Sequence, residues 1–168
     1  TTPNGEASKA IVYAASAPAP LTISTLTATP ASPGAIGAPA TFTTTGTITI
    51  PTGRTNVVTG GTFNYNSGSW GGGGSISLSG GLTLNLTPNL TNDTTALLLD
   101  NVTVNGPGRL VNAAGRTLIL ANSTDVKSPL DNLGELVIRG INTIDGPLTA
   151  PASSVTSLRQ ADWTGSAC

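Results

Sequence analysis

Histidine and methionine are absent from this sequence of 168 residues, and Cys168 is its only cysteine. Without histidine, the Ser-His-Asp and Cys-His arrangements of nucleophilic catalysis and the histidine-containing zinc sites are excluded. A single thiol forms no disulfide within the chain and no thiolate cage for a metal, so the fold has to depend on packing. We therefore expect no metal ion and no cofactor.

Charged residues are also scarce, since they make up 9% of the chain and the net charge is −1. Soluble domains usually contain roughly 25%. The seven lysines and arginines are too few and too scattered for the phosphate contacts on which nucleic-acid affinity depends. No apolar run approaches the roughly 20 residues of a membrane-spanning helix. We expect neither a nucleic-acid partner nor a membrane span.

Small and polar residues take the place of the missing charges: 28 threonines, 21 glycines, 15 serines and 13 asparagines. Leucine, isoleucine, valine and phenylalanine still account for 39 residues, which together with the low net charge predicts a folded chain. The bias toward Thr, Asn and Gly is typical of exported surface proteins, and the chain starts at Thr1 without a signal peptide, as a processed chain would. These features predict an extracellular or cell-surface protein.

Residues 1–40 are rich in proline, which lacks the N–H that a strand ladder needs and fixes φ. We expect an extended segment in which residues 10–14 and 21–27 contribute edge strands. Such strands would cap one end of the fold or insert into a neighbouring molecule. The residues expected to form this assembly strand are Ile11, Val12, Tyr13, Leu21, Ile23 and Leu26.

From Thr41 onward, short runs of alternating apolar and Thr, Ser or Asn residues are separated by Gly, Asn, Asp or Pro. This period of two is typical of β-strands, and no run of helical length carries an apolar stripe with the helical period. The sequence therefore predicts an all-β domain over residues 41–160, followed by a tail over residues 161–168. The runs are residues 46–50, 61–65, 75–78, 82–86, 101–104, 116–120 and 135–138.

A longer repeat separates Asn92, Asn112 and Asn132, which lie 20 residues apart. Leu118 follows Asn112 by six residues, whereas Leu136 follows Asn132 by four. These two intervals differ by two residues, which keeps the same side chains pointing inward, whereas a difference of one residue would turn the apolar side chains outward. A repeat of this length with short strands predicts a parallel β-helix, or β-solenoid, of about five or six coils. A β-sandwich, whose strands recur about every 8 to 12 residues with hairpin turns, is the alternative.

In a β-solenoid the three asparagines would lie one above the other at a turn. Each side chain would then bond to the asparagine of the next coil, as in stacked cross-β layers. We predict a ladder of Asn92, Asn112 and Asn132.

Two fragments resemble a known family of coils: residues 110–120 (Leu-Val-Asn-Ala-Ala-Gly-Arg-Thr-Leu-Ile-Leu) and residues 130–138 (Leu-Asp-Asn-Leu-Gly-Glu-Leu-Val-Ile). They are similar to the Asn-x-Gly-x-Leu-x-Ile/Val coils of filamentous-haemagglutinin-type adhesins and autotransporter passenger domains. The resemblance extends over about residues 75–145. It implies a right-handed parallel β-helix displayed outside a bacterial cell and used for adhesion or as a rigid stalk.

Acidic residues are the only remaining candidates for catalysis. Asp125 and Asp145 lie 20 residues apart and would need a cation between them if they stacked on neighbouring coils. We expect instead that these two are separate turn residues in contact with solvent, and that Arg116 and Glu135 form a surface ion pair. We therefore predict that the chain is not an enzyme.

Aromatic residues make up 4% of the chain. Trp70 precedes the glycines Gly71–Gly74, which we interpret as a flexible loop, so Trp70 is the best candidate for an exposed surface contact. Phe63 and Tyr65 share one side of a strand, and we expect them in the core. Threonine-rich solenoids include ice-binding proteins, but we expect no ice binding, because regular Thr-x-Thr rows at the coil spacing are not evident in the sequence.

These observations lead to three hypotheses for the function, of which the first is preferred. The chain is a non-enzymatic structural or adhesive domain of an extracellular surface. Alternatively, it is a subunit of an extracellular filament, joined to the next copy by its N-terminal strand. As a third hypothesis, it binds or degrades polysaccharide through Asp125, Asp131 and Asp145. The corresponding partners are copies of the chain itself, other surface proteins, or polysaccharide.

Overall fold

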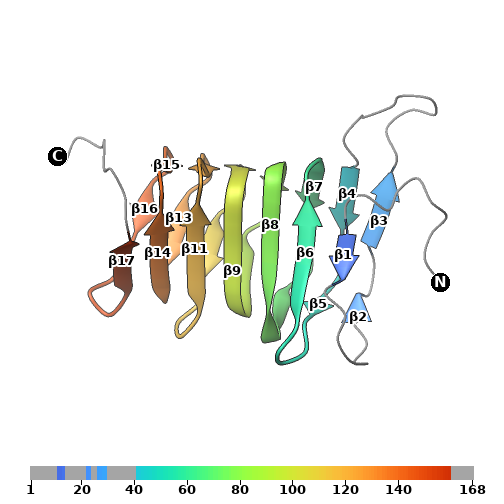
Figure 1. Ribbon diagram of the computed structural model, residues 1–168, viewed down its shortest axis with the longest axis horizontal. Coiled ribbons are helices and arrows are strands. Elements are labelled where there is room, and N and C mark those ends of the chain that lie inside the picture. Colours follow the sequence, from blue (N-terminus) through green and yellow to red (C-terminus); the bar gives the residue numbers. More distant parts are fainter. Residues whose placement is uncertain (1–10, 14–21, 24–25, 30–40, 160–168) are drawn as a thin grey trace.

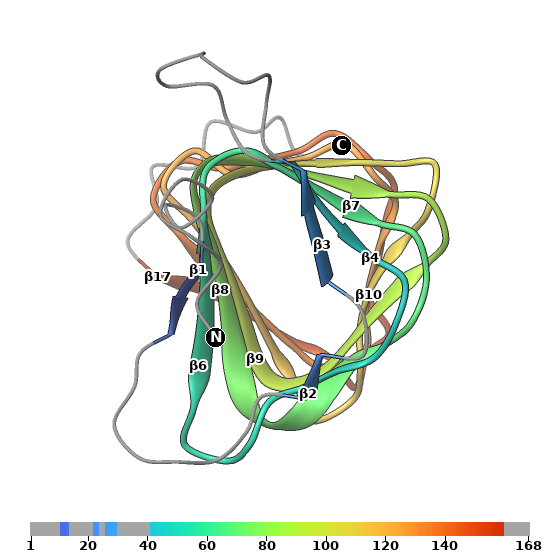
Figure 2. The same ribbon diagram turned by 90° about the vertical axis from the view of Figure 1, so that its right-hand side faces the viewer.

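The computed structural model, which describes residues 11–13, 22–23, 26–29 and 41–159, is a parallel β-solenoid of about six turns. The strands of successive coils stack side by side along the long axis (Figure 1), and each coil closes around the core when it is viewed along that axis (Figure 2). The predicted all-β, parallel β-helix is confirmed. The alternative, a β-sandwich, is wrong, because strands of neighbouring coils run parallel and no hairpin joins them. The described part of the chain contains no helix with the length and apolarity needed to cross a membrane.

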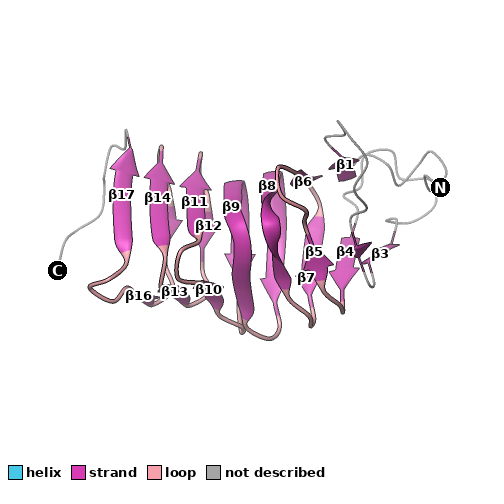
Figure 3. Ribbon diagram, turned by 90° about the horizontal axis from the view of Figure 1, so that it is seen from below, coloured by secondary structure: helices cyan, strands magenta, loops and turns pink. Residues whose placement is uncertain are grey.

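Each coil contributes a strand segment to each of three sides of the solenoid, which we name faces A, B and C. The segments of one side lie next to one another from coil to coil (Figure 3). Strands β8 (Trp70–Leu86) and β9 (Leu90–Asn105) are long and contribute to all three faces, bending between them. Face A also contains β4 (Thr41–Thr44), β7 (Thr62–Tyr65), β12 (Asp125–Val126) and β15 (Thr143–Ile144). Face B also contains β5 (Ile48–Thr49), β10 (Leu110–Asn112), β13 (Leu130–Asn132) and β16 (Leu148–Thr149). Face C also contains β6 (Thr55–Thr59), β11 (Thr117–Ala121), β14 (Glu135–Arg139) and β17 (Val155–Arg159).

The core consists of inward-pointing residues between Ile48 and Ile138, stacked in columns from coil to coil, and Ile144 packs against it. Leu118 lies opposite Leu97 of the preceding coil and Leu136 of the following one, and all three side chains are fully buried. The same pairing places Leu120 opposite Ile138. The turn after Asn112 is two residues longer than the turn after Asn132, and this difference leaves the same side chains pointing into the core. Because side chains alternate between the two sides of a strand, turns whose lengths differ by an even number of residues keep leucine and valine inside.

The N-terminal part of the chain contributes three short strands: β1 (Ile11–Tyr13), β2 (Thr22–Ile23) and β3 (Leu26–Thr29). They pair antiparallel with β6, β5 and β4 respectively, which are the three strands of the first coil. These pairings occupy the edge that the first coil would otherwise expose, and an exposed strand edge invites pairing with another chain.

The glycines Gly71–Gly74 lie within strand β8, so the prediction of a flexible loop at this place is wrong. The chain turns here from face B to face C, close against the preceding coil. A β-carbon on Gly72 would collide with the backbone oxygen of Ile50, and one on Gly74 with the Ile50 side chain and the backbone oxygen of Pro51. Glycine is required at positions 72 and 74 because the two coils approach each other there too closely for side chains.

Candidate functional site

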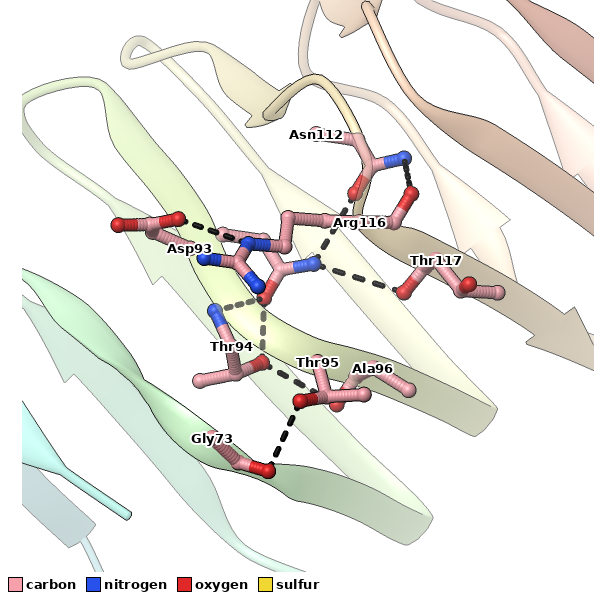
Figure 4. Close-up of polar contacts among 9 residues, drawn as sticks. Gly73, Asp93, Thr94, Thr95, Ala96, Asn112, Arg116 and Thr117 are labelled. Carbon is pink, nitrogen blue, oxygen red and sulfur yellow. Dashed lines mark hydrogen bonds and ion pairs between the residues drawn. The ribbon is translucent and has the colours of Figure 1, made fainter. Parts of the chain in front are cut away.

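Asn92, Asn112 and Asn132 lie in register at the turn between faces B and C, and all three side chains are fully buried. The side-chain nitrogen Nδ2 of Asn92 donates to Oδ1 of Asn112 at 3.0 Å (Figure 4). Nδ2 of Asn112 in turn donates to Oδ1 of Asn132 at 2.8 Å. The amides therefore form a hydrogen-bonded column, the buried ladder, that passes through three coils.

The remaining polar atoms of the buried ladder are also satisfied. Nδ2 of Asn112 donates to the backbone oxygens of Arg116 (3.1 Å) and Glu135 (2.9 Å). At one end of the ladder, Oδ1 of Asn92 accepts from the backbone N–H of Thr94 at 3.2 Å and from its hydroxyl (Figure 4). At the other end, Nδ2 of Asn132 donates to the backbone oxygen of Gly134 at 3.1 Å. A buried polar network in which every member has a partner fixes the local structure and is closed to outside ligands.

Arg116 lies beside the buried ladder but bonds outward, to Asp93 of the preceding coil, with 2.8 Å between Nε and Oδ1 (Figure 4). The predicted pair of Arg116 and Glu135 is therefore wrong. Glu135 lies opposite Thr117 and accepts a hydrogen bond from its hydroxyl at 3.0 Å. Because the Asp93 side chain is 60% exposed, this ion pair contributes no more than about 1 kcal/mol to stability.

The three aspartates of the polysaccharide hypothesis do not converge. Asp125 lies opposite Thr143 in face A, two residues from the position that would stack it on Asp145, and its carboxylate lies 3.3 Å from Lys127 Nζ. Asp131 belongs to face B, where it accepts a hydrogen bond from Arg109 at 2.6 Å. Within the described ranges, no group of three or more acidic or cysteine residues is arranged to hold a metal ion.

Trp70 is buried, with 1% of its surface exposed, so the prediction that it makes an exposed surface contact is wrong. It occupies an inward position between Ile48 of the preceding coil and Asn92 of the following one. Its ring packs edge-on against those of Phe63 and Tyr65, with centroids 5.4 and 5.9 Å apart. The prediction that Phe63 and Tyr65 belong to the core is confirmed. Burial raises the pKa of the Tyr65 hydroxyl, which donates to the backbone oxygen of Gly68 at 2.5 Å.

The residues predicted to form an assembly strand pair with the first coil of the same chain. Ile11, Val12 and Tyr13 form β1, opposite Val58, Val57 and Asn56. Ile23 lies opposite Ile48, and Leu26 lies opposite Thr44. Leu21 lies outside the described residues.

A second asparagine ladder, on the outside of face A, escaped the sequence analysis. Asn64, Asn85 and Asn105 lie in register on three coils. Nδ2 of Asn105 donates to Oδ1 of Asn85 at 3.0 Å, and Nδ2 of Asn85 donates to Oδ1 of Asn64 at 2.9 Å. We name this column the outer ladder; its side chains are half-buried.

Beside the outer ladder runs a column of threonines, Thr41, Thr62, Thr83 and Thr103, in register on four coils. The signal in the sequence is a recurring Thr-x-Asn, at residues 62–64, 83–85 and 103–105. It was missed because the intervals between the repeats are unequal, at 21 and then 20 residues. Only the backbone pairing shows that these residues share one column.

Comparison with known proteins identifies no matching family model, and no curated protein or solved structure matches the chain either.

Proposed function

We propose that the chain is a non-enzymatic structural or adhesive module displayed outside the cell, in the manner of filamentous-haemagglutinin-type and autotransporter-type surface β-helices. The observation that carries this proposal is the unbroken stack: all three faces continue through successive coils, and one core runs through them. Each coil contacts only its neighbours, so the length of such a rod is set by the number of coils.

Two further features support a structural role. The three buried asparagines bond to one another in the buried ladder, which ties three coils together. The acidic residues that would serve a glycan-degrading enzyme are divided between faces A and B. The geometry therefore supports rigidity better than catalysis.

The proposal is tested by electron microscopy and small-angle scattering of the full chain, together with a hydrolysis screen on neutral and acidic polysaccharides. We expect discrete rods and no turnover. Turnover that disappears when Asp125, Asp131 and Asp145 are all changed to Asn would replace the structural role by the enzymatic one.

A filament is the second candidate, because the three N-terminal strands form their pairs by edge-to-edge antiparallel contact with coil one. The same contacts form equally well when the strands come from a neighbouring copy, which is how strand exchange joins subunits. The proline-rich residues 28–40 would be the connector in this arrangement; residues 28 and 29 belong to β3, and residues 30–40 lie outside the described residues.

A disulfide distinguishes the two arrangements, since Val12 lies opposite Val57 in the β1–β6 pair. In a Cys168→Ser background, the double substitution Val12→Cys and Val57→Cys is oxidised at increasing protein concentration. A capped monomer gives a cross-linked monomer at every concentration, whereas strand exchange gives covalent multimers that increase with concentration. The single Val12→Cys variant is the control for random thiol oxidation.

A further inference from the structure

The outer side of face A carries an array of threonine and asparagine side chains that the structural role does not use. Its first column is Thr41, Thr62, Thr83 and Thr103, and its second is Thr43 followed by the outer ladder. Beyond it, Asn66 and Thr87 form a further pair, in which the Thr87 hydroxyl lies 3.5 Å from Asn66 Oδ1. Neighbouring residues within a column are about 4.8 Å apart, the spacing between strands, and neighbouring columns are about 6.6 Å apart, the length of two residues of a parallel strand.

The side chains of this array are held in fixed positions before any ligand arrives. The outer ladder fixes the amides of Asn64, Asn85 and Asn105 through hydrogen bonds of 2.9 and 3.0 Å. Threonine is β-branched and therefore has few side-chain conformations in a strand. A pre-ordered array loses little conformational entropy on binding.

The array keeps hydrogen-bonding capacity for an outside partner. An asparagine amide has two N–H donors, and the outer ladder uses one donor of Asn85 and one of Asn105 and only the acceptor of Asn64. In the part of the chain that the structure describes, the hydroxyls of Thr62, Thr83 and Thr103 bond to no other residue. Three successive coils therefore each present a free hydroxyl beside an amide with a free donor.

The chemistry of the array restricts its partner to a neutral one. All the array residues are Thr or Asn, and charged side chains appear on this face only in the later coils, at Asp125, Lys127 and Asp145. Sugar rings usually stack on exposed aromatic rings, but Phe63, Tyr65 and Trp70 are all buried. A neutral polysaccharide would find no stacking platform among these residues.

We propose that this array binds ice. The surface of an ice crystal is an uncharged, rigid lattice of donors and acceptors that repeats in two directions, as the array does. Each hydrogen bond exchanged with liquid water contributes little by itself. A solid ligand engages many array positions at once and is already ordered, so the small contributions add. This activity extends beyond the structural role and does not depend on it.

The test is the thermal hysteresis of the full chain, which is the gap between the melting and growth temperatures of a single ice crystal in its presence. Thr83→Tyr places a bulky ring in the middle of the array. Ser77→Tyr is the matched control, because Ser77 also points outward from strand β8 but belongs to face C. Far-UV circular dichroism establishes that both variants keep the fold.

We expect hysteresis and faceted ice crystals with the parent chain and with Ser77→Tyr, and a loss to the buffer baseline with Thr83→Tyr. No hysteresis with the folded parent chain overturns the proposal, as does equal activity of the two variants. If the parent shows no hysteresis but pellets with microcrystalline cellulose or chitin, and Thr83→Tyr does not, the partner is a crystalline polysaccharide. Rods seen by electron microscopy in any of these cases leave the structural role intact.

Discussion

Replacement of Asn112 by leucine tests the energetic role of the buried ladder. Leucine branches at Cγ as asparagine does, so it fits the site in shape while removing the donor and the acceptor. Asn112 is the middle residue of the buried ladder, and it bonds to both Asn92 and Asn132. Asn85 is the middle residue of the outer ladder and bonds to Asn64 and Asn105, which makes Asn85→Leu the matched control.

The expected magnitude follows from the groups left without partners. In Asn112→Leu, the Asn92 amide loses its 3.0 Å acceptor and Asn132 Oδ1 loses its 2.8 Å donor, both in the dry interior. Two unsatisfied buried groups cost about 2–6 kcal/mol together. The buried leucine side chain returns roughly 1.5–3 kcal/mol. With the mid-range values, about 4 and about 2 kcal/mol, the net loss in the free energy of unfolding is about 2 kcal/mol.

The assay is urea unfolding followed by circular dichroism and tryptophan fluorescence. Asn112→Leu should lower the unfolding midpoint without changing the m value, because the surface exposed on unfolding is the same. In Asn85→Leu the neighbouring amides turn to water, so the change should stay within about 0.5 kcal/mol. A parent-like midpoint for Asn112→Leu, or an equal loss for Asn85→Leu, would refute the reasoning.

Three further predictions concern the core and the close turn. Gly74→Ala should destabilise the fold by about 1–3 kcal/mol in urea unfolding, because its β-carbon would collide with Ile50 and Pro51. Gly71→Ala is the control: the atom nearest to its β-carbon would be 3.9 Å away, so stability should change by less than about 0.5 kcal/mol. Trp70→Ala should cost about 3–5 kcal/mol in the same assay, and a change below about 0.5 kcal/mol would restore the surface role for this residue. Burial raises the pKa of Tyr65 above its ordinary value of 10.0, so the native state keeps this proton at a pH at which the unfolded state has released it. The contribution of Tyr65 to stability should therefore be complete below pH 10.0 and decrease as the pH rises through the raised pKa. Tyr65→Phe should not show this part of the decline in alkaline solution.

The sequence by itself determined the all-β class, most of the strands with their inward-facing residues, and the parallel stacking of the coils. Apolar residues at every second position require one side of each strand to be buried, and this pattern alone predicts an all-β chain. Asn92, Asn112 and Asn132 are separated by two intervals of 20 residues, and these intervals predicted the repeat. When the intervals are equal, identical residues can be assigned to one column even though the shape of the turns is unknown. The sequence also showed that the turn after Asn112 is two residues longer than the turn after Asn132. An even difference keeps the same side chains pointing inward, and this can be counted along the chain without knowledge of the structure.

Tertiary structure alone decided which residues meet across unequal turns. Thr62, Thr83 and Thr103 share a column although their intervals differ, and Arg116 reaches Asp93 although Glu135 lies at nearly the repeat distance. Trp70 and the glycines after it were misplaced because glycine suits both a loop and a strand pressed against another backbone, and only the neighbouring coil distinguishes the two. Register between coils is set by hydrogen bonds and turn geometry over residues far apart in the chain, and these long-range contacts create the array on face A.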